Sequence, residues 1–207
     1  MDRKVYIVGK DPVPASLTLA AGESFFATFV VEEGVSADVT MEVDLVGEGA
    51  SLDLGGVYRC SGDERVAFHL NVRHLCGGCT SRQLFKGIVG GRSRVVFDGL
   101  IHVAPDAQKT EAYQENHSIL LSGEAQVQTS PQLEIYADDV KCSHGATVGR
   151  LNEEEQFYMR SRGISLEDAK VLQMISFVSP VLEHVHDVEL REKIASEVEA
   201  SLRTLAV

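Results

Sequence analysis

The sequence predicts a mainly β chain of 207 residues that ends in a small α-helical domain. Up to about residue 150, apolar residues tend to alternate with polar ones and glycine is frequent, a pattern typical of short β-strands. Beyond residue 150, apolar residues recur every three or four positions, which is typical of amphipathic helices. We therefore divide the chain into a β core over residues 1–150 and a helical domain over residues 151–207.

The β core contains many short alternating segments. Every second residue is apolar in Val66–Val72, and Leu133–Ala137 repeats the pattern. Because successive side chains of a strand point to opposite faces, each such segment buries one face only. The predicted strands cover residues 18–19, 24–31, 37–45, 51–57, 66–72, 83–89, 93–103, 118–121, 125–128, 133–137 and 146–148.

Two segments of the β core resemble each other at a fixed spacing. LFKGIV (Leu84–Val89) and VFDGLI (Val96–Ile101) align Gly87 with Gly99. A repeat of this kind favours stacked coils, in which each coil buries its apolar face on the next. Only two segments match well, so the periodicity leaves both a β-solenoid and a β-sandwich open.

The helical domain begins with two clear start signals. Asn152 is a suitable N-cap, and the glutamates that follow it suit the positive end of a helix, which Gly163 then terminates. Ser165 and Asp168 form a capping box for a second helix. The sequence therefore predicts a short first helix, a tight turn at Gly163 and a second helix immediately after it.

Apolar faces define the rest of the helical domain. The second helix carries Ala169, Leu172 and Ile175 on one face, and we expect Pro180 to break or bend it. The last helix, roughly Val188–Leu205, carries an apolar stripe that packs onto the same chain or faces another protein, the first being favoured. The stripe consists of Leu190, Ile194, Val198, Leu202 and Leu205.

Composition limits the partners and the compartment. The 19 basic and 31 acidic residues give a net charge of −12 without any basic run, which disfavours nucleic acid and anionic membranes as partners. Val5–Val8 is too short for a secretion signal, and no later stretch approaches a membrane span. Four cysteines are sparse for a disulfide-stapled domain, so we expect a cytoplasmic protein with reduced thiols.

The stretch KCSHGAT contains the first candidate site. Cys142 and His144 lie two positions apart, so on a strand their side chains point to the same side and could meet one ligand. Thiolate with imidazole suits zinc, copper or the iron of an iron–sulfur cluster. Alternatively, Cys142 is a small buried apolar residue and His144 caps a turn at Gly145. Two ligands are fewer than a closed site requires, so a metal would need others from elsewhere or from a partner chain.

The stretch HLCGGC contains the second candidate site. His74, Cys76 and Cys79 have the spacing of half a zinc site or of a redox pair. The alternative is a tight turn at Gly77–Gly78 between two strands, with incidental cysteines. A further pair, His184 and His186, lies on a helical segment, where positions i and i+2 diverge and form a polar surface.

Three longer motifs resemble a known family. They are FDGLIHVAPDAQKTEAYQENHSILLS (Phe97–Ser122), PQLEIYADDVKCSHGATVG (Pro131–Gly149) and EEEQFYMRSRGIS (Glu153–Ser165). In this order they resemble the C-terminal half of the SufB/SufD family of iron–sulfur cluster assembly proteins, and its SufD branch in particular. The similarity is strong from about Arg82 to Ser165.

The resemblance implies a fold, a function and partners. The expected fold is a right-handed parallel β-helix followed by a small C-terminal α-helical domain. The expected function is that of a non-enzymatic scaffold subunit, on which a SufC-type ATPase docks through the C-terminal helices. A transient iron–sulfur cluster would be shared with a SufB-like subunit or a second copy, and His144 with Cys142 would be its metal-binding residues. The alternatives are a β-helix enzyme acting on polysaccharide and a zinc-stabilised interaction module built on Cys76 and Cys79.

Overall fold

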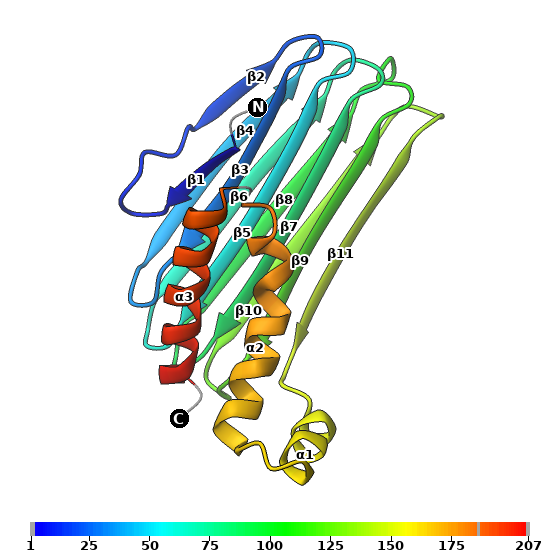
Figure 1. Cartoon of the computed structure of the whole chain (residues 1–207). Helices are drawn as coiled ribbons and strands as arrows, with labels where there is room; N and C mark the ends of the chain where they lie inside the picture. Colours follow the sequence, from blue (N-terminus) through cyan, green and yellow to red (C-terminus); the bar gives the residue numbers. More distant parts are fainter. Residues whose placement is uncertain (1–2, 186, 206–207) are drawn as a thin grey trace.

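The computed structural model of the chain describes residues 3–185 and 187–205. Within those residues the chain forms eleven strands and three helices, and the strands lie in two sheets of parallel neighbours (Figure 1). The strands are β1 (Arg3–Ile7), β2 (Ser16–Leu19), β3 (Ser24–Val31), β4 (Ala37–Leu45), β5 (Ser51–Cys60), β6 (Arg65–His74), β7 (Thr80–Val89), β8 (Arg94–Val103), β9 (Glu111–Leu120), β10 (Gln126–Ile135) and β11 (Lys141–Gly149).

Consecutive strands alternate between the two sheets. One sheet has the order β1-β3-β5-β7-β9-β11 and the other β10-β8-β6-β4-β2. Each coil therefore contributes one strand to each sheet, and register partners lie about 30 residues apart along the chain. This is a parallel β-helix, so the predicted fold class is confirmed and the sandwich alternative is wrong. The match between Gly87 and Gly99 relates β7 and β8, which lie on opposite sheets of one coil, and not two stacked coils.

Aromatic rings fill the space between the sheets. The ring of Phe85 lies 5.0 Å from that of Phe68 and 5.1 Å from that of Phe97, between ring centroids. Glycines on neighbouring coils make room for the rings, because a Cβ on Gly87 would overlap the ring of its register partner Tyr58. The aromatic stack thus depends on alternation between large and absent side chains from coil to coil.

The strand predictions succeeded where inner positions are apolar. Residues 24–31 and 37–45 were predicted with the observed bounds of β3 and β4. The strand β9 was predicted only at its end, and β10 was predicted as two pieces. The inward-facing positions of β9 carry polar side chains that are nonetheless buried, namely Gln114, Asn116 and Ser118. No prediction covered β1.

Three helices follow the β-helix, α1 (Glu153–Ser161), α2 (Leu166–Leu182) and α3 (Val188–Leu205). Asn152 caps α1 as predicted, since its Oδ1 accepts the backbone N–H groups of Glu154 and Glu155 at 2.9 and 3.2 Å. In the same way the hydroxyl of Ser165 caps α2. Of the expected break or bend at Pro180, the break is wrong, because α2 runs on to Leu182. Pro180 lies in the last turn, where its missing N–H removes a hydrogen bond only near the helix end.

Helices α2 and α3 cover the outer face of the sheet of odd-numbered strands (Figure 1). The apolar stripe of α3 packs onto the same chain, as favoured, since Ile194, Val198 and Leu202 are buried. In α2 the predicted face is right at Ala169, which is buried, and at Ile175, which packs partly buried against the same core. Leu172 is exposed, contrary to the prediction, and the rest of the buried face is formed by Val171, Met174, Val178 and Val181. Together with outward residues of the sheet, these side chains form a second core.

Polar contacts attach the helical segments to the sheet. The hydroxyl of Ser201 on α3 donates to Glu33 at 2.7 Å, and Arg59 donates to the Glu197 carbonyl at 3.1 Å. His184 lies in the turn after α2 and not on a helix as predicted, and it is half-buried with Nδ1 3.1 Å from Asp53, so it joins this turn to the sheet and is not a polar surface residue. The other histidine of that pair, His186, lies outside the described residues. In the described part of the chain, no helix is both long and apolar enough to cross a membrane.

Candidate functional site

The candidate pair Cys142 and His144 lies on the last strand of its sheet. Strand β11 pairs with β9, with Cys142 opposite Ala112 and His144 opposite Gln114. Both partners are buried between the sheets, and register partners on parallel strands point to the same side. Cys142 and His144 therefore share the inner face of the sheet, as the alternation predicts.

The inner face is open to solvent at this end of the β-helix. Within the described residues, β10 pairs only with β8 and β11 only with β9, so no further coil covers them. The inward-facing residues of β8, such as Phe97 and Ile101, are fully buried, whereas those of β10 are half-buried or exposed. We call the inward-facing residues of these last strands the open end. They are Val127, Thr129, Pro131, Leu133, Ile135, Cys142, His144, Ala146 and Val148.

Polar side chains line the interior next to the open end. Gln114, the register partner of His144, donates to Gln83 at 3.1 Å and occupies the space that Gly99 leaves on the opposite sheet. At the next inward-facing position of β9, Asn116 accepts from the hydroxyl of Tyr58 at 3.0 Å and donates to Thr129 at 3.1 Å. His144 thus lies over a hydrogen-bonded amide layer, whereas the middle coils have an aromatic core.

The two candidate side chains differ in exposure. His144 is exposed, whereas Cys142 is half-buried and packs against the main core. Burial raises the pKa of the Cys142 thiol, and a hydrogen bond with the backbone of Ala112 lowers it in part. A metal bound here would have to displace the thiol proton. In the described chain no three side chains of His, Cys, Asp or Glu are grouped closely enough to hold a metal, so this pair offers two ligands.

A hydrogen-bonded network lies on the opposite face of the same strand. On the outer face, His117 of β9 has Nδ1 2.8 Å from the hydroxyl of Thr147 on β11 and Nε2 3.1 Å from Glu115. Nearby, the ammonium of Lys86 lies 4.7 Å from the ring centroid of Phe177 on α2. Sequence reasoning missed this network. The available signal was the spacing of His117 and Thr147, which equals one coil.

The stretch HLCGGC leads from β6 into β7 through a turn, as the alternative interpretation of a tight turn between two strands predicts. Gly78 has a φ of 67°, which favours glycine. The His74 ring is fully buried, with Nε2 2.8 Å from the Ser81 hydroxyl, and burial lowers its pKa to about 4. Cys79 is also buried and its thiol donates to the Gly47 carbonyl at 3.2 Å, while Cys76 is half-buried. The three side chains are therefore not gathered into a ligand set.

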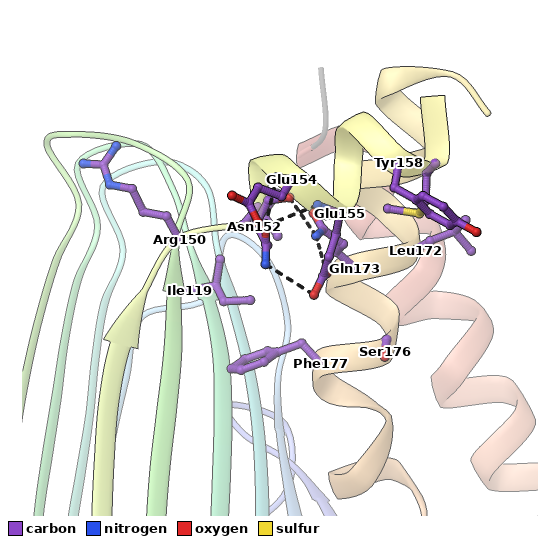
Figure 2. Close-up of a pocket in the computed structure, with 12 residues that line it drawn as sticks. Ile119, Arg150, Asn152, Glu154, Glu155, Tyr158, Leu172, Gln173, Ser176 and Phe177 are labelled. Atoms are coloured by element: carbon purple, nitrogen blue, oxygen red, sulfur yellow. Dashed lines mark hydrogen bonds between the residues drawn. The ribbon is translucent and has the colours of Figure 1, made fainter. Parts of the chain in front are cut away.

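A second candidate surface lies where the sheet meets the helices. A groove of about 910 Å³ runs between β9, α1 and α2, and Figure 2 shows Ile119 and Phe177 facing each other across it. Tyr158 and Leu172 lie together farther along α1 and α2 (Figure 2). On α1, Phe157 and Tyr158 are 72 % and 60 % exposed, which is unusual for aromatic side chains and typical of contact surfaces.

Comparison with known proteins gives one consistent result. Residues 21–177 match the family model described as "SUF system FeS cluster assembly, SufBD core domain". The chain is 38 % identical to the iron–sulfur cluster assembly protein SufD of Escherichia coli over 182 residues, which is 88 % of this chain and 43 % of that protein.

Proteins of two other organisms are also similar to the chain. The chain is 38 % identical to a chloroplastic protein of Arabidopsis thaliana, ABCI7, over 78 % of this chain and 34 % of that protein. It is 28 % identical to SufD of Bacillus subtilis over 77 % of this chain and 37 % of that protein. The chain thus spans less than half the length of these relatives.

Proposed function

This chain belongs to the SufBD family of the SUF iron–sulfur cluster assembly system, and on that premise we propose that it is a scaffold subunit on which a cluster is assembled and then passed on. Its side chains would hold and release the cluster without making or breaking covalent bonds of a substrate, so we propose that it is not itself an enzyme. The cluster is the cargo of the scaffold, and the site of action would be the cytoplasm.

The observation that carries this proposal is the open end. Cys142 and His144 lie there on one face, and two ligands leave a cluster incompletely held. The open end also carries exposed apolar residues, including Ile135 and Val148, and β10 and β11 each have an edge without a strand neighbour in the described chain. Such edges and apolar residues favour pairing with another chain. We propose that a SufB-like subunit or a second copy covers the open end and supplies the remaining ligands.

Incomplete ligation suits a scaffold. Neutral imidazole and thiolate both bind the iron of iron–sulfur clusters. A cluster held partly by each of two chains is released when the chains separate, whereas four ligands from one chain would retain it. His144 would bind without losing a proton when neutral, while Cys142 binds only after its thiol is deprotonated.

We propose that the energy for separation comes from a SufC-type ATPase docked on the helical domain. The apolar stripe of α3 is buried against the sheet and is not available for docking. The exposed aromatic side chains of α1 and the adjacent groove are available, and Phe157 is the most exposed of them. Among the C-terminal helices, this surface of α1 is therefore the proposed docking surface.

The role of His144 is tested by reconstitution without oxygen. The chain, its SufB-like partner and the ATPase are supplied with iron and sulfide, and cluster formation is followed by absorbance. His144→Ala should reduce cluster yield at least about tenfold, since a lost metal ligand typically costs that much affinity. His69→Ala, a half-buried histidine on the outer face of the other sheet, is the matched control and should not change the yield. Full yield from the His144 variant would overturn the assigned role.

ATPase docking is tested by light scattering of the mixed full-length chains. Phe157→Asp should abolish the complex, because a carboxylate would be buried in an apolar contact. Val188→Asp on α3 introduces the same charge at an exposed apolar residue away from the groove, and it should leave the complex intact. Equal binding by both variants would place the ATPase elsewhere.

A further inference from the structure

The network around His117 is directed at the strand that carries the candidate ligands. His117 lies on the outer face of β9, and its Nδ1 is 2.8 Å from the hydroxyl of Thr147 on β11. Its Nε2 is 3.1 Å from a carboxylate oxygen of Glu115 on its own strand. The imidazole therefore bridges an exposed carboxylate on its own, inner strand to a hydroxyl on the edge strand.

For a neutral imidazole, the chemistry of the three groups gives each of the two hydrogen bonds one direction. An ionised carboxylate only accepts, so Nε2 of a neutral His117 carries the proton and donates to Glu115. Nδ1 is then the acceptor, and the hydroxyl of Thr147 donates to it. Glu115 thus holds the imidazole in the tautomer and orientation that bind Thr147.

Strand β11 has few other attachments by side chains. In the described structure its ladder runs to β9 alone, and both its faces are largely exposed. Near its start, Lys141 contacts Glu111 at 2.8 Å, but both side chains are substantially exposed, and such pairs contribute little. The His117 side chain is only 21 % exposed, against 74 % for that of Lys141, while its partner Thr147 is exposed.

We propose that His117 is a positioning residue that clamps β11 to β9 and thereby fixes Cys142 and His144 at the open end. The candidate ligands lie along β11 between its attachments at Lys141 and Thr147. Because side chains alternate along a strand, the ligands point to the opposite face from Thr147. Opening of the strand end at Thr147 would therefore displace His144, three residues away, before it displaced the covered coils. The role at the cluster site rests on the proposed function, whereas the clamp itself does not.

The same network extends toward α2. The ammonium of Lys86, on the strand next to β9, lies 4.7 Å from the ring centroid of Phe177. Burial lowers the pKa of Lys86, and the charge of Glu115 opposes this effect. Glu115 therefore interacts with both His117 and Lys86, and the clamp is electrostatically connected to a residue that lies in the groove between sheet and helix.

The clamp is tested by hydrogen exchange of residues 141–149 in the free chain, without cluster or partner. His117→Ala and Thr147→Val should each accelerate exchange there about fivefold, the equivalent of one typical net hydrogen bond. His117→Asn and Thr147→Ser retain an acceptor and a hydroxyl in similar places, so both should restore slow exchange. Thr80→Val removes a hydroxyl bond between inner strands of the same sheet, and it should leave β11 unchanged.

Cluster yield in the reconstituted system is the second readout. His117→Ala and Thr147→Val should reduce the yield while His117→Asn and Thr147→Ser restore it, with the melting temperature changing by less than about 3 °C. Unchanged exchange in the first two variants would overturn the clamp. Faster exchange with full cluster yield would overturn its role at the site. Because exchange is measured without any cluster, these results are separable from a failure of the His144 test.

Discussion

Two stretches of this chain carry the same pair of residue types at the same spacing, with opposite outcomes. His74 and Cys76 belong to the middle of the β-helix, where His74 is fully buried and hydrogen-bonded to Ser81. Cys142 and His144 belong to its last coil, where His144 is exposed and Cys142 half-buried. What separates them is not local sequence but whether a further coil covers the inner face.

The comparison shows how a β-helix produces a site. In the covered coils an inward-facing polar residue has only the same chain to bond with, and His74 bonds Ser81 through Nε2 while its buried Nδ1 has no partner in the described structure. In the last coil the same direction leads out of the protein, so an inward-facing residue is available to a ligand or a partner. Whether a residue lies in a covered coil or in the last coil therefore decides whether it is available to a ligand.

The largest expected difference between the regions concerns glycine. Gly87→Ala, in a covered coil, would place a methyl group inside the ring of Tyr58, so the free energy of unfolding should fall by about 3 kcal/mol or more. Gly145→Ala, directly after the candidate ligand His144, meets no atom within 4 Å and should change that free energy by less than about 0.5 kcal/mol. Urea unfolding followed by circular dichroism measures both, and similar losses would contradict the distinction between covered and open coils.

The next difference concerns a buried carboxylate at the covered turns. Glu64 is 5 % exposed and accepts backbone N–H groups of Gly34, Ser61 and Gly62 and the hydroxyl of Ser93. Burial opposes its ionisation, but these hydrogen bonds outweigh burial and lower its pKa to about 2. Glu64→Gln should lower the free energy of unfolding at pH 7 by about 2 kcal/mol, because the amide cannot accept all four.

The acid dependence of this effect has a defined direction. A carboxylate whose folded pKa lies below its ordinary value stabilises the protein above about pH 4.5, and the contribution is lost as pH falls toward 2. The difference between wild type and Glu64→Gln should therefore shrink over that window. Glu124→Gln, at an exposed glutamate in the turn before β10, is the matched control and should change little at any pH. A pH-independent difference for Glu64→Gln would contradict the argument.

The same contrast explains how far the fold could be predicted. Alternation predicted β3 and β4 with their observed bounds because their inner positions are apolar and covered. It missed most of β9, since Gln114 and Asn116 face inward, and most of β11, since that strand is exposed on both faces. In α2 the helical spacing predicted the burial of Ala169 correctly and that of Leu172 wrongly. Tertiary contact packs Val171 and Met174 in place of Leu172, which the spacing alone could not show.

The sequence predicted that the two candidate ligands point to the same face of a strand, but not how exposed they are. Period two placed Cys142 and His144 on one face from sequence alone. Their exposure depends on the absence of a covering coil in the described chain, which no local pattern carries. The partners of His117 were equally hidden, because Thr147 becomes its neighbour only through the pairing of β9 with β11.

His74 provides a smaller effect that depends on pH. Burial lowers its pKa to about 4, below the ordinary 6.5, so the unfolded chain binds a proton that the folded chain excludes. The free energy of unfolding should therefore fall by about 2 kcal/mol from this group between pH 7.5 and pH 5. His74→Gln keeps a nitrogen near Ser81 and cannot titrate, so its unfolding curve should lack this loss. An unchanged pH dependence in that variant would show that His74 is hydrated in the folded protein.

The last prediction concerns the reactivity of the four cysteine thiols and involves no change in stability. Burial raises the pKa of Cys60 to about 12, and Cys79 is equally inaccessible, whereas Cys76 and Cys142 are half-buried. In the native free chain, iodoacetamide should therefore label Cys76 and Cys142 at least about tenfold faster than the buried pair, as peptide mass spectrometry would measure. Addition of a SufB-like partner should then protect Cys142 while leaving Cys76 reactive, because only Cys142 lies at the open end. Equal protection of both thiols would place the partner over the turns instead, and the open end would lose its assigned role.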